Sequence, residues 1–88
     1  MIEKIFDNNL KDIGKKFSKL LPYKNRDFLL IINIDGERYI LGELTDLIET
    51  SESRSLKINL ISDNLLYNTG SATYPLSDIT CAYLLPRL

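Results

Sequence analysis

The sequence predicts an α+β domain in which an N-terminal amphipathic helix precedes about five antiparallel strands that form a small bent sheet or barrel. Three observations predict it. Apolar residues recur at helical spacing over residues 1–21, apolar runs typical of strands follow over residues 27–85, and Asp-Gly or Asp-Asn pairs separate several of those runs. One helix followed by short strands is typical of α+β and small-barrel domains.

Composition bounds the class of protein. A chain of 88 residues, 44% hydrophobic and 26% charged, suits a single globular domain over residues 1–88 with one core. The longest wholly apolar stretch, residues 28–32, is far shorter than the roughly 20 residues of a membrane span. Acids and amides interrupt the N-terminus where a signal peptide needs an apolar run. With Cys81 as the single cysteine, we expect a cytoplasmic protein without a membrane partner.

The helix predicted over residues 1–21 rests on a stripe of apolar side chains. At about 100° per residue, the stripe and the lysines fall on opposite sides of the helix. The apolar side holds Ile2, Phe6, Leu10, Ile13, Phe17 and Leu20, and the basic side holds Lys4, Lys11, Lys15 and Lys19. Pro22 ends the helix, because the residue before a proline is disfavoured in the helical region.

Residues 28–34 are predicted to form a strand that is apolar on both faces. Such a strand needs a cover on each side. We expect the domain interior on one side and the N-terminal helix, or a partner chain, on the other.

Asp35-Gly36 predicts a hairpin from that strand to a return strand over residues 38–44. Two registers stay open. A two-residue turn places Ile34 opposite Glu37, whereas a three-residue loop places Ile31 opposite Tyr39.

The remaining elements are predicted from shorter signals. Gly42 inside the return strand predicts a bend or bulge. That strand either continues through residues 47–48 into a polar loop, which is the simpler interpretation, or gives way to a helical turn capped by Asp46. Strands follow over residues 55–62, 65–67 and 80–85, with turns at 63–64 and 68–72 and a 3₁₀ turn near 77–78. The predicted core comprises Phe6, Leu10, Ile13, Phe17, Leu30, Ile32, Leu41, Leu56, Ile58, Leu60, Ile79, Cys81 and Tyr83.

Part of this pattern resembles the Sm-like small β-barrels. Asp35, Gly36, Gly42 and Leu44 bear the likeness, with "PLSDITCAYLL" in place of the closing turn and strand. The resemblance covers most of residues 27–85 and implies an Sm-like barrel. The chain departs from the Sm pattern at three places. Five residues separate the two glycines, where Sm proteins typically have four. "LIETSES" stands where the RNA-contacting loop of Sm proteins has Met-Asn, and "LSDI" stands where they have an Arg-Gly pair before the last strand. Because both nucleotide-contacting signatures are missing, no RNA-binding residue is carried over.

The residue types exclude several chemistries. The sequence has no histidine, which excludes Ser-His and Cys-His nucleophile pairs, and its four glycines are isolated, which excludes a Gly-rich phosphate loop. Cys81 alternates in phase with its apolar neighbours, as a core cysteine does. The acids at every third residue form either an acidic patch that binds a metal or simply solvated charges: Glu43, Asp46, Glu49 and Glu52. We predict a protein that is not an enzyme and has no catalytic residue, no metal and no cofactor.

Charge is divided unevenly along the chain. Residues 1–26 have seven bases and three acids, and the remainder has four bases and nine acids. Lysines four residues apart on one helix repel by a few tenths of a kcal/mol per pair, which an anionic partner would relieve. The alternative interpretation is that these lysines are simply the solvated side of the helix. Tyr67 and Tyr74 flank the predicted 68–72 turn, where they could contact a partner or pack on each other. The candidate binding residues are Lys11, Lys15, Lys19, Lys24, Arg26, Tyr67 and Tyr74.

These features predict a small non-catalytic protein-binding module, of an adaptor or inhibitor type, that docks on a partner protein and also self-associates. The competing hypothesis is a nucleic-acid-binding protein that uses the basic side of the N-terminal helix. Binding to nucleic acid would weaken steeply with salt, whereas docking to a protein would depend on apolar residues of the exposed sheet face.

Overall fold

The computed structural model describes residues 2–24, 28–63 and 66–86, without the side chains of residues 62–69 and 86. All strands join one sheet in the order β1-β6-β2-β3-β4-β5, and every neighbouring pair is antiparallel. The elements are β1 (Glu3–Phe6), α1 (Ile13–Leu20), η1 (Leu21–Tyr23), β2 (Phe28–Ile34), β3 (Arg38–Glu49), β4 (Arg54–Asp63), β5 (Leu66–Pro75), η2 (Leu76–Asp78) and β6 (Ile79–Pro86), where η marks a 3₁₀ helix.

The predicted architecture of an N-terminal helix followed by about five strands is wrong. The chain starts with the edge strand β1, which pairs with β6, and the short helix α1 lies between β1 and β2. Asp7 interrupts the predicted helix, because its side chain accepts a hydrogen bond from the Asn9 N–H and its carbonyl accepts one from the Leu10 N–H. α1 then begins after Asp12, whose carboxylate accepts the Lys15 N–H at 3.1 Å and caps the helix.

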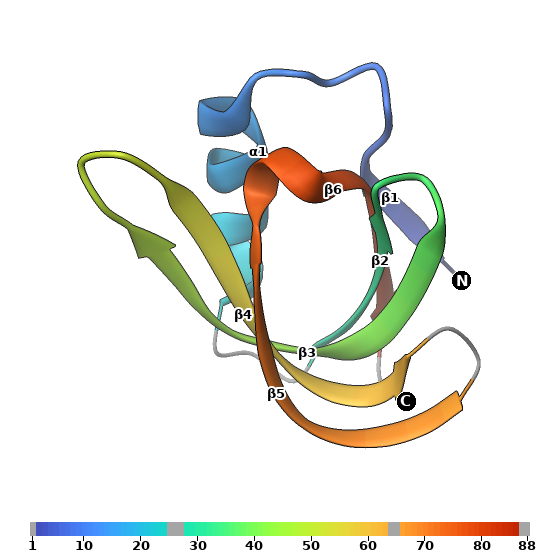
Figure 1. Ribbon diagram of the computed structural model, residues 1–88. Coiled ribbons are helices and arrows are strands. Elements are labelled where there is room, and N and C mark those ends of the chain that lie inside the picture. Colours follow the sequence, from blue (N-terminus) through green and yellow to red (C-terminus); the bar gives the residue numbers. More distant parts are fainter. Residues whose placement is uncertain (1, 25–27, 64–65, 87–88) are drawn as a thin grey trace.

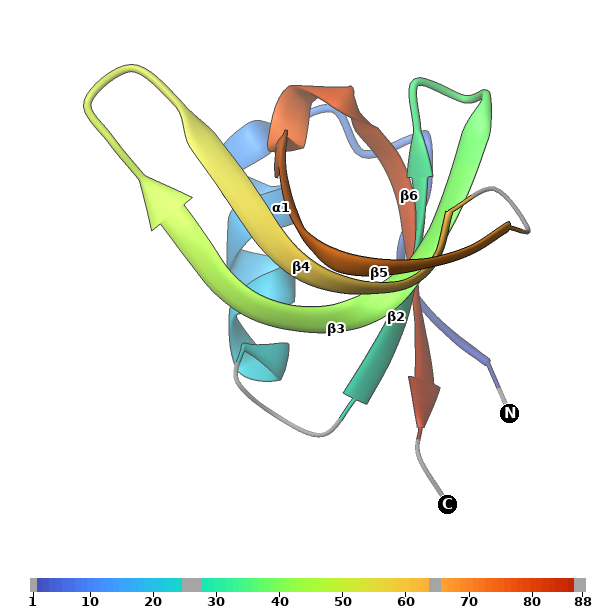
Figure 2. The same cartoon turned by 60° about the horizontal axis from the view of Figure 1, so that its bottom comes forward.

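The sheet curls strongly along β3 and β4 (Figures 1 and 2). The β3–β4 register shifts between Leu41 and Gly42 and again between Leu44 and Asp46, and each shift bends the pair. A Cβ at Gly42 would lie 2.4 Å from the Asn59 carbonyl oxygen, so only glycine permits this close approach of the two backbones. The bend predicted at Gly42 is confirmed.

A contact between Arg38 and Tyr74 shows how far the sheet curls. Arg38 begins β3, whereas Tyr74 pairs through Leu56 with Leu47, near the other end of β3. The Arg38 guanidinium nevertheless lies 5.9 Å from the centre of the Tyr74 ring, and its Nη2 donates to the Tyr74 hydroxyl at 3.4 Å. The two ends of β3 are therefore brought round toward each other, and the inner face of the sheet encloses the core.

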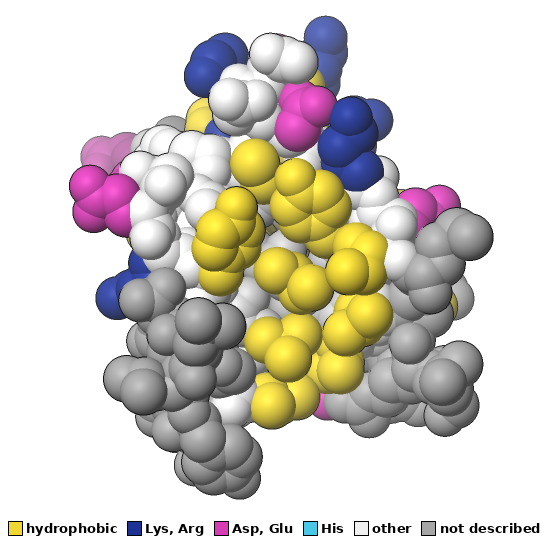
Figure 3. Space-filling view, turned by 90° about the vertical axis from the view of Figure 1, so that its right-hand side faces the viewer, with side chains coloured by type: hydrophobic (Ala, Val, Ile, Leu, Met, Phe, Trp, Pro, Cys, Tyr) yellow, Lys and Arg dark blue, Asp and Glu magenta, His cyan; other side chains and the backbone are white. Residues whose placement is uncertain are grey.

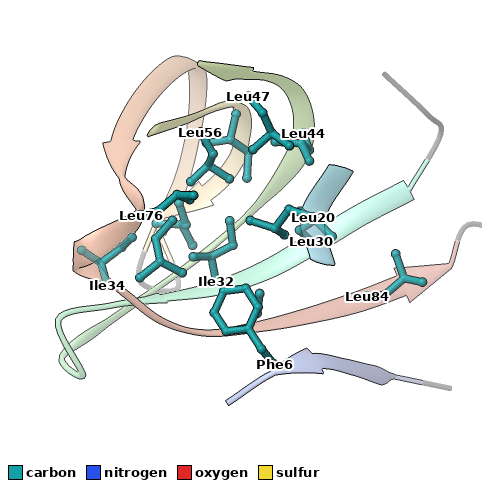
Figure 4. Packing of buried hydrophobic residues seen from close by; sticks show 14 of the residues in the cluster. Phe6, Leu20, Leu30, Ile32, Ile34, Leu44, Leu47, Leu56, Leu76 and Leu84 are labelled. Carbon is teal, nitrogen blue, oxygen red and sulfur yellow. The ribbon is translucent and has the colours of Figure 1, made fainter. Parts of the chain in front are cut away.

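The core lies on this inner face, with α1 closing one side through Leu20 (Figure 4). Its buried members are Phe6, Leu20, Leu30, Ile32, Ile34, Ile40, Leu44, Leu47, Leu56, Ile58, Leu60, Leu76, Ile79, Ala82 and Leu84. Seven predicted core residues are confirmed: Phe6, Leu30, Ile32, Leu56, Ile58, Leu60 and Ile79. Three others, Leu10, Ile13 and Phe17, are partly buried and pack against the core.

Leu41, Cys81 and Tyr83 were expected in the core but lie outside it. Ile34 pairs with Ile79 while Asn33 pairs with Cys81, so β6 contains one extra residue between these pairs. An extra residue reverses the inside-outside alternation beyond it. Ala82 and Leu84 consequently turn inward in place of Cys81 and Tyr83.

The register of the 35–37 hairpin differs from both predicted alternatives. Ile34 pairs with Arg38, and Ile32 pairs with Ile40. Asp35 and Gly36 both have positive φ, 55° and 74°, and the Glu37 N–H donates to the Ile34 carbonyl at 3.0 Å. The prediction of a turn at Asp35-Gly36 is confirmed. The partner of Ile34, however, is Arg38, one residue after the Glu37 that a two-residue turn would pair with it.

The later elements confirm some predictions and correct others. β3 continues to Glu49, as the simpler interpretation predicted, and η2 confirms the 3₁₀ turn. The turn predicted at residues 68–72 is wrong, because β5 runs without a break from Leu66 to Pro75 and takes up a positive φ of 126° at Gly70.

Candidate functional site

The outer face of the sheet holds a second set of apolar side chains. Leu30, Ile32 and Ile34 of β2 point into the core, so Leu29 and Ile31 lie on the opposite face. Pairing with β3 and β6 extends this set across three adjacent strands. We define the outer apolar face as Leu29, Ile31, Tyr39, Leu41, Cys81, Tyr83 and Leu85.

These side chains form a surface that solvent reaches. Tyr39 is 51% exposed and the other six are half-buried. Figure 3 views the side of the molecule formed by β1, β2 and β6 and shows a continuous area of hydrophobic side chains at its centre, with charged side chains above it. Ile2, 56% exposed, directly precedes β1 and by alternation shares the face of Lys4.

Of the two covers predicted for this second face, the N-terminal helix or a partner chain, the helix does not lie on it. α1 packs instead against β1, η1 and η2, and Figure 1 shows it on the side of the sheet away from the view of Figure 3. The continuous apolar run of β2 therefore has one face in the core and one face on the surface.

One polar atom of the outer face, the side-chain carbonyl oxygen of Asn33, already has a hydrogen-bond partner. Asn33 lies between Tyr39 and Cys81 in the pairing, is only 3% exposed, and accepts the Thr80 hydroxyl at 2.6 Å. The neighbouring Cys81 raises the pKa of the Tyr83 phenol, since two adjacent anions would repel each other. The Tyr83 phenol is therefore uncharged at neutral pH, and the Asn33 side-chain carbonyl oxygen is hydrogen-bonded.

Two charges of opposite sign mark opposite margins of this face. Lys4 on β1 pairs in register with Tyr83, and Glu43 on β3 pairs in register with Leu29. Lys4 also forms an exposed ion pair of 2.9 Å with Asp7. This hydrogen bond and charge raise the pKa of Lys4 and lower that of Asp7.

The predicted lysine stripe is not one helical stripe in the structure. Lys15 and Lys19 are exposed on α1, but Lys11 precedes the capping residue Asp12 and is not part of the helix. Lys24 follows η1 and forms an ion pair of 3.0 Å with Asp46 on β3. Hydrogen bonding to Lys24 lowers the pKa of Asp46. Arg26 lies outside the described residues.

The two candidate tyrosines lie on one strand. Tyr74 packs against the edge of the core and contacts Arg38. The backbone of Tyr67 pairs with Ser62, and its side chain lies outside the described part of the structure. Packing of the two rings across a hairpin turn is excluded, because no turn separates them in β5.

Lys16 is the charged residue whose position we did not predict. It is 4% exposed, its Nζ donates to the Ile79 carbonyl at 2.6 Å, and it lies 5.6 Å from the centre of the Phe6 ring. Burial, followed by the nearby charge of Lys11, lowers the pKa of Lys16. Lys16 is three residues after Ile13 and four residues before Leu20, which places it on the apolar side of α1. This spacing is the sequence signal from which its burial could have been predicted.

A shallow hollow of about 300 Å³ lies where the β3–β4 turn meets the start of α1, and it is lined by Ile13 and residues 50–54. Across the described ranges, no three Cys, Asp or Glu side chains gather in a group that could hold a metal ion. No helix in the same ranges is long and apolar enough to cross a membrane. Comparisons with protein-family models, curated proteins and solved structures found no match.

Proposed function

We propose that this chain is a small non-catalytic protein-binding module that docks a partner protein through the outer apolar face. The observation that supports the proposal is the set of seven apolar side chains that spans β6, β2 and β3 and is not covered by α1. The largest contiguous apolar patch on a monomeric protein is often a binding site.

The composition and rigidity of the outer apolar face also suit protein docking. Tyrosine is enriched in protein interfaces, and Tyr39 and Tyr83 supply large rings with few rotatable bonds. All seven residues sit on strands whose other faces pack in the core. A partner therefore meets a surface that loses little conformational freedom on binding.

Site-specific photocross-linking tests this proposal. A photoreactive amino acid replaces Leu41 in the outer apolar face or, as a matched control, Lys15 on α1, and the protein is irradiated in an extract of its native cells. We expect protein adducts from position 41 that are absent from position 15 and are lost when Ile31→Glu is added. Adducts of any protein count here, including this chain itself. No adduct from position 41, or equal adducts from both positions, would overturn the proposal.

A further inference from the structure

We propose that the protein bound at the outer apolar face is a second copy of this chain, so that two sheets pack face to face in a symmetric dimer. This inference rests on the proposed function and names its partner. It is argued from the charges at the margins, the apolar groups at the centre and the size of the face.

The charges at the margins make the face complementary to itself. Lys4 and Glu43 lie on β1 and β3, which are separated in the sheet by β6 and β2. In a face-to-face dimer the two-fold axis lies in the plane of the interface. If the axis runs parallel to the strands, each margin meets the opposite margin of the partner. With that axis between β6 and β2, Lys4 lies over Leu41 of the partner subunit, and its long side chain reaches toward Glu43 of the partner subunit, two residues further along β3. The reverse contact forms at the other margin.

The same axis matches apolar groups at the centre. Tyr83 on β6 and Ile31 on β2 are paired neighbours. The two-fold axis therefore places Tyr83 of one subunit over Ile31 of the partner subunit, and the reverse contact follows by symmetry. Asn33, the polar side chain of β2 on this face, already accepts a hydrogen bond from Thr80. Covering the centre therefore leaves its side-chain carbonyl satisfied.

The size of the face is that of an interface core. Three strands spaced about 4.8 Å apart, over five residues rising about 3.3 Å each, give an area on the order of 240 Å². A standard interface buries roughly 800 Å² per partner, with an apolar core inside a polar rim. The outer apolar face can supply that core, and the margins with Lys4 and Glu43 supply part of the rim.

Charge reversal at the two margins tests the dimer. Sedimentation velocity over a concentration series gives the mass relative to the 10.1 kDa chain. We expect wild type to form dimers, and Lys4→Glu and Glu43→Lys each to raise the dimer Kd by roughly tenfold or more, because each variant brings like charges together. The K4E chain has only acids at these two positions and the E43K chain has only bases. An equimolar mixture of the two is therefore expected to recover dimers.

Three further variants separate this effect from others. Asp7→Asn removes only the ion pair within the chain, Lys15→Glu reverses a charge on α1, and both are expected to leave the dimer Kd within roughly twofold of wild type. Ile31→Glu is expected to abolish the dimer by placing a charge at its centre. Circular dichroism is used to check that each variant is folded.

Several results would overturn the inference. These are a wild type that stays monomeric at every concentration, a dimer that survives I31E and both charge reversals, and a mixture of K4E and E43K that does not recover. The photocross-linking experiment separates the two proposals. Adducts with another protein but none with this chain would overturn the dimer alone, whereas the absence of any adduct from position 41 would overturn the docking function as well.

Discussion

The ammonium of Lys16 on α1 donates a 2.6 Å hydrogen bond to the backbone carbonyl of Ile79, at the start of β6. Ile79 lies beside the extra residue that reverses the alternation of β6, where the strand pairing is locally irregular. Lys16 thus satisfies a carbonyl at this irregularity and ties the helix to the sheet from inside the core.

Removing Lys16 is expected to destabilise the fold in two steps. Lys16→Met retains most of the apolar volume but leaves the Ile79 carbonyl without its donor, a loss of about 1–2 kcal/mol in the free energy of unfolding. Lys16→Ala adds a cavity, for a total loss of about 2–4 kcal/mol. Urea denaturation measures both. The exposed control Lys15→Ala is expected to stay within about 0.5 kcal/mol of wild type, and equal losses for K16M and K15A would contradict this role.

The lowered pKa of Lys16 predicts a dependence of stability on pH. Below its folded-state pKa, Lys16 is protonated in both states and the folded state bears the full desolvation penalty. Between that pKa and the ordinary lysine pKa of 10.5, the unfolded state binds more protons, so stability rises with pH. We expect the free energy of unfolding of wild type, relative to K16M, to increase as pH approaches 10.5 from neutrality, because other titrations cancel in the difference. A flat difference would contradict the lowered pKa.

Gly42→Ala is expected to disrupt the bend of β3. Its Cβ would lie 2.4 Å from the Asn59 carbonyl oxygen and 2.7 Å from Ile58 Cγ1, so two packed strands must separate. We expect a loss of about 2–4 kcal/mol in the free energy of unfolding, at or above the usual range for overpacking. Gly14→Ala is the matched control, because the nearest atoms there belong to the side chains of Asp12 and Arg54. The prediction fails if thermal and urea denaturation rank the two variants equally.

The nucleic-acid alternative has its own measurement. Fluorescence anisotropy follows labelled single- and double-stranded oligonucleotides at low and physiological salt. We expect no binding at either salt concentration, since protein docking through the outer apolar face does not require the lysines. Micromolar binding that weakens with salt and is lost on replacing Lys11, Lys15 and Lys19 with Ala would support the alternative and contradict our proposal.

Local patterns in the sequence determined several elements. Asp35-Gly36 predicted the hairpin turn, because these residues accept positive φ more readily than others. Gly42 predicted the bend, and the alternation of residues 55–61 predicted the inward side of β4. The apolar run of residues 28–34 also predicted a strand with two faces to cover. Each of these signals lies within a few residues of the element it specifies.

Only the tertiary structure decided the rest. Residues 3–6 have a helical apolar spacing and yet pair with β6, because that edge offers them a strand ladder while Asp7 ends the segment in a turn. The extra residue of β6 moves Cys81 and Tyr83 outside, and it is visible only from the pairing with β2. The sequence by itself determined the strand over residues 28–34, the turn at Asp35-Gly36 and the bend at Gly42. Which apolar residues form the core and which form the outer apolar face was decided by strand register, since a shift of one residue exchanges the two faces of a strand.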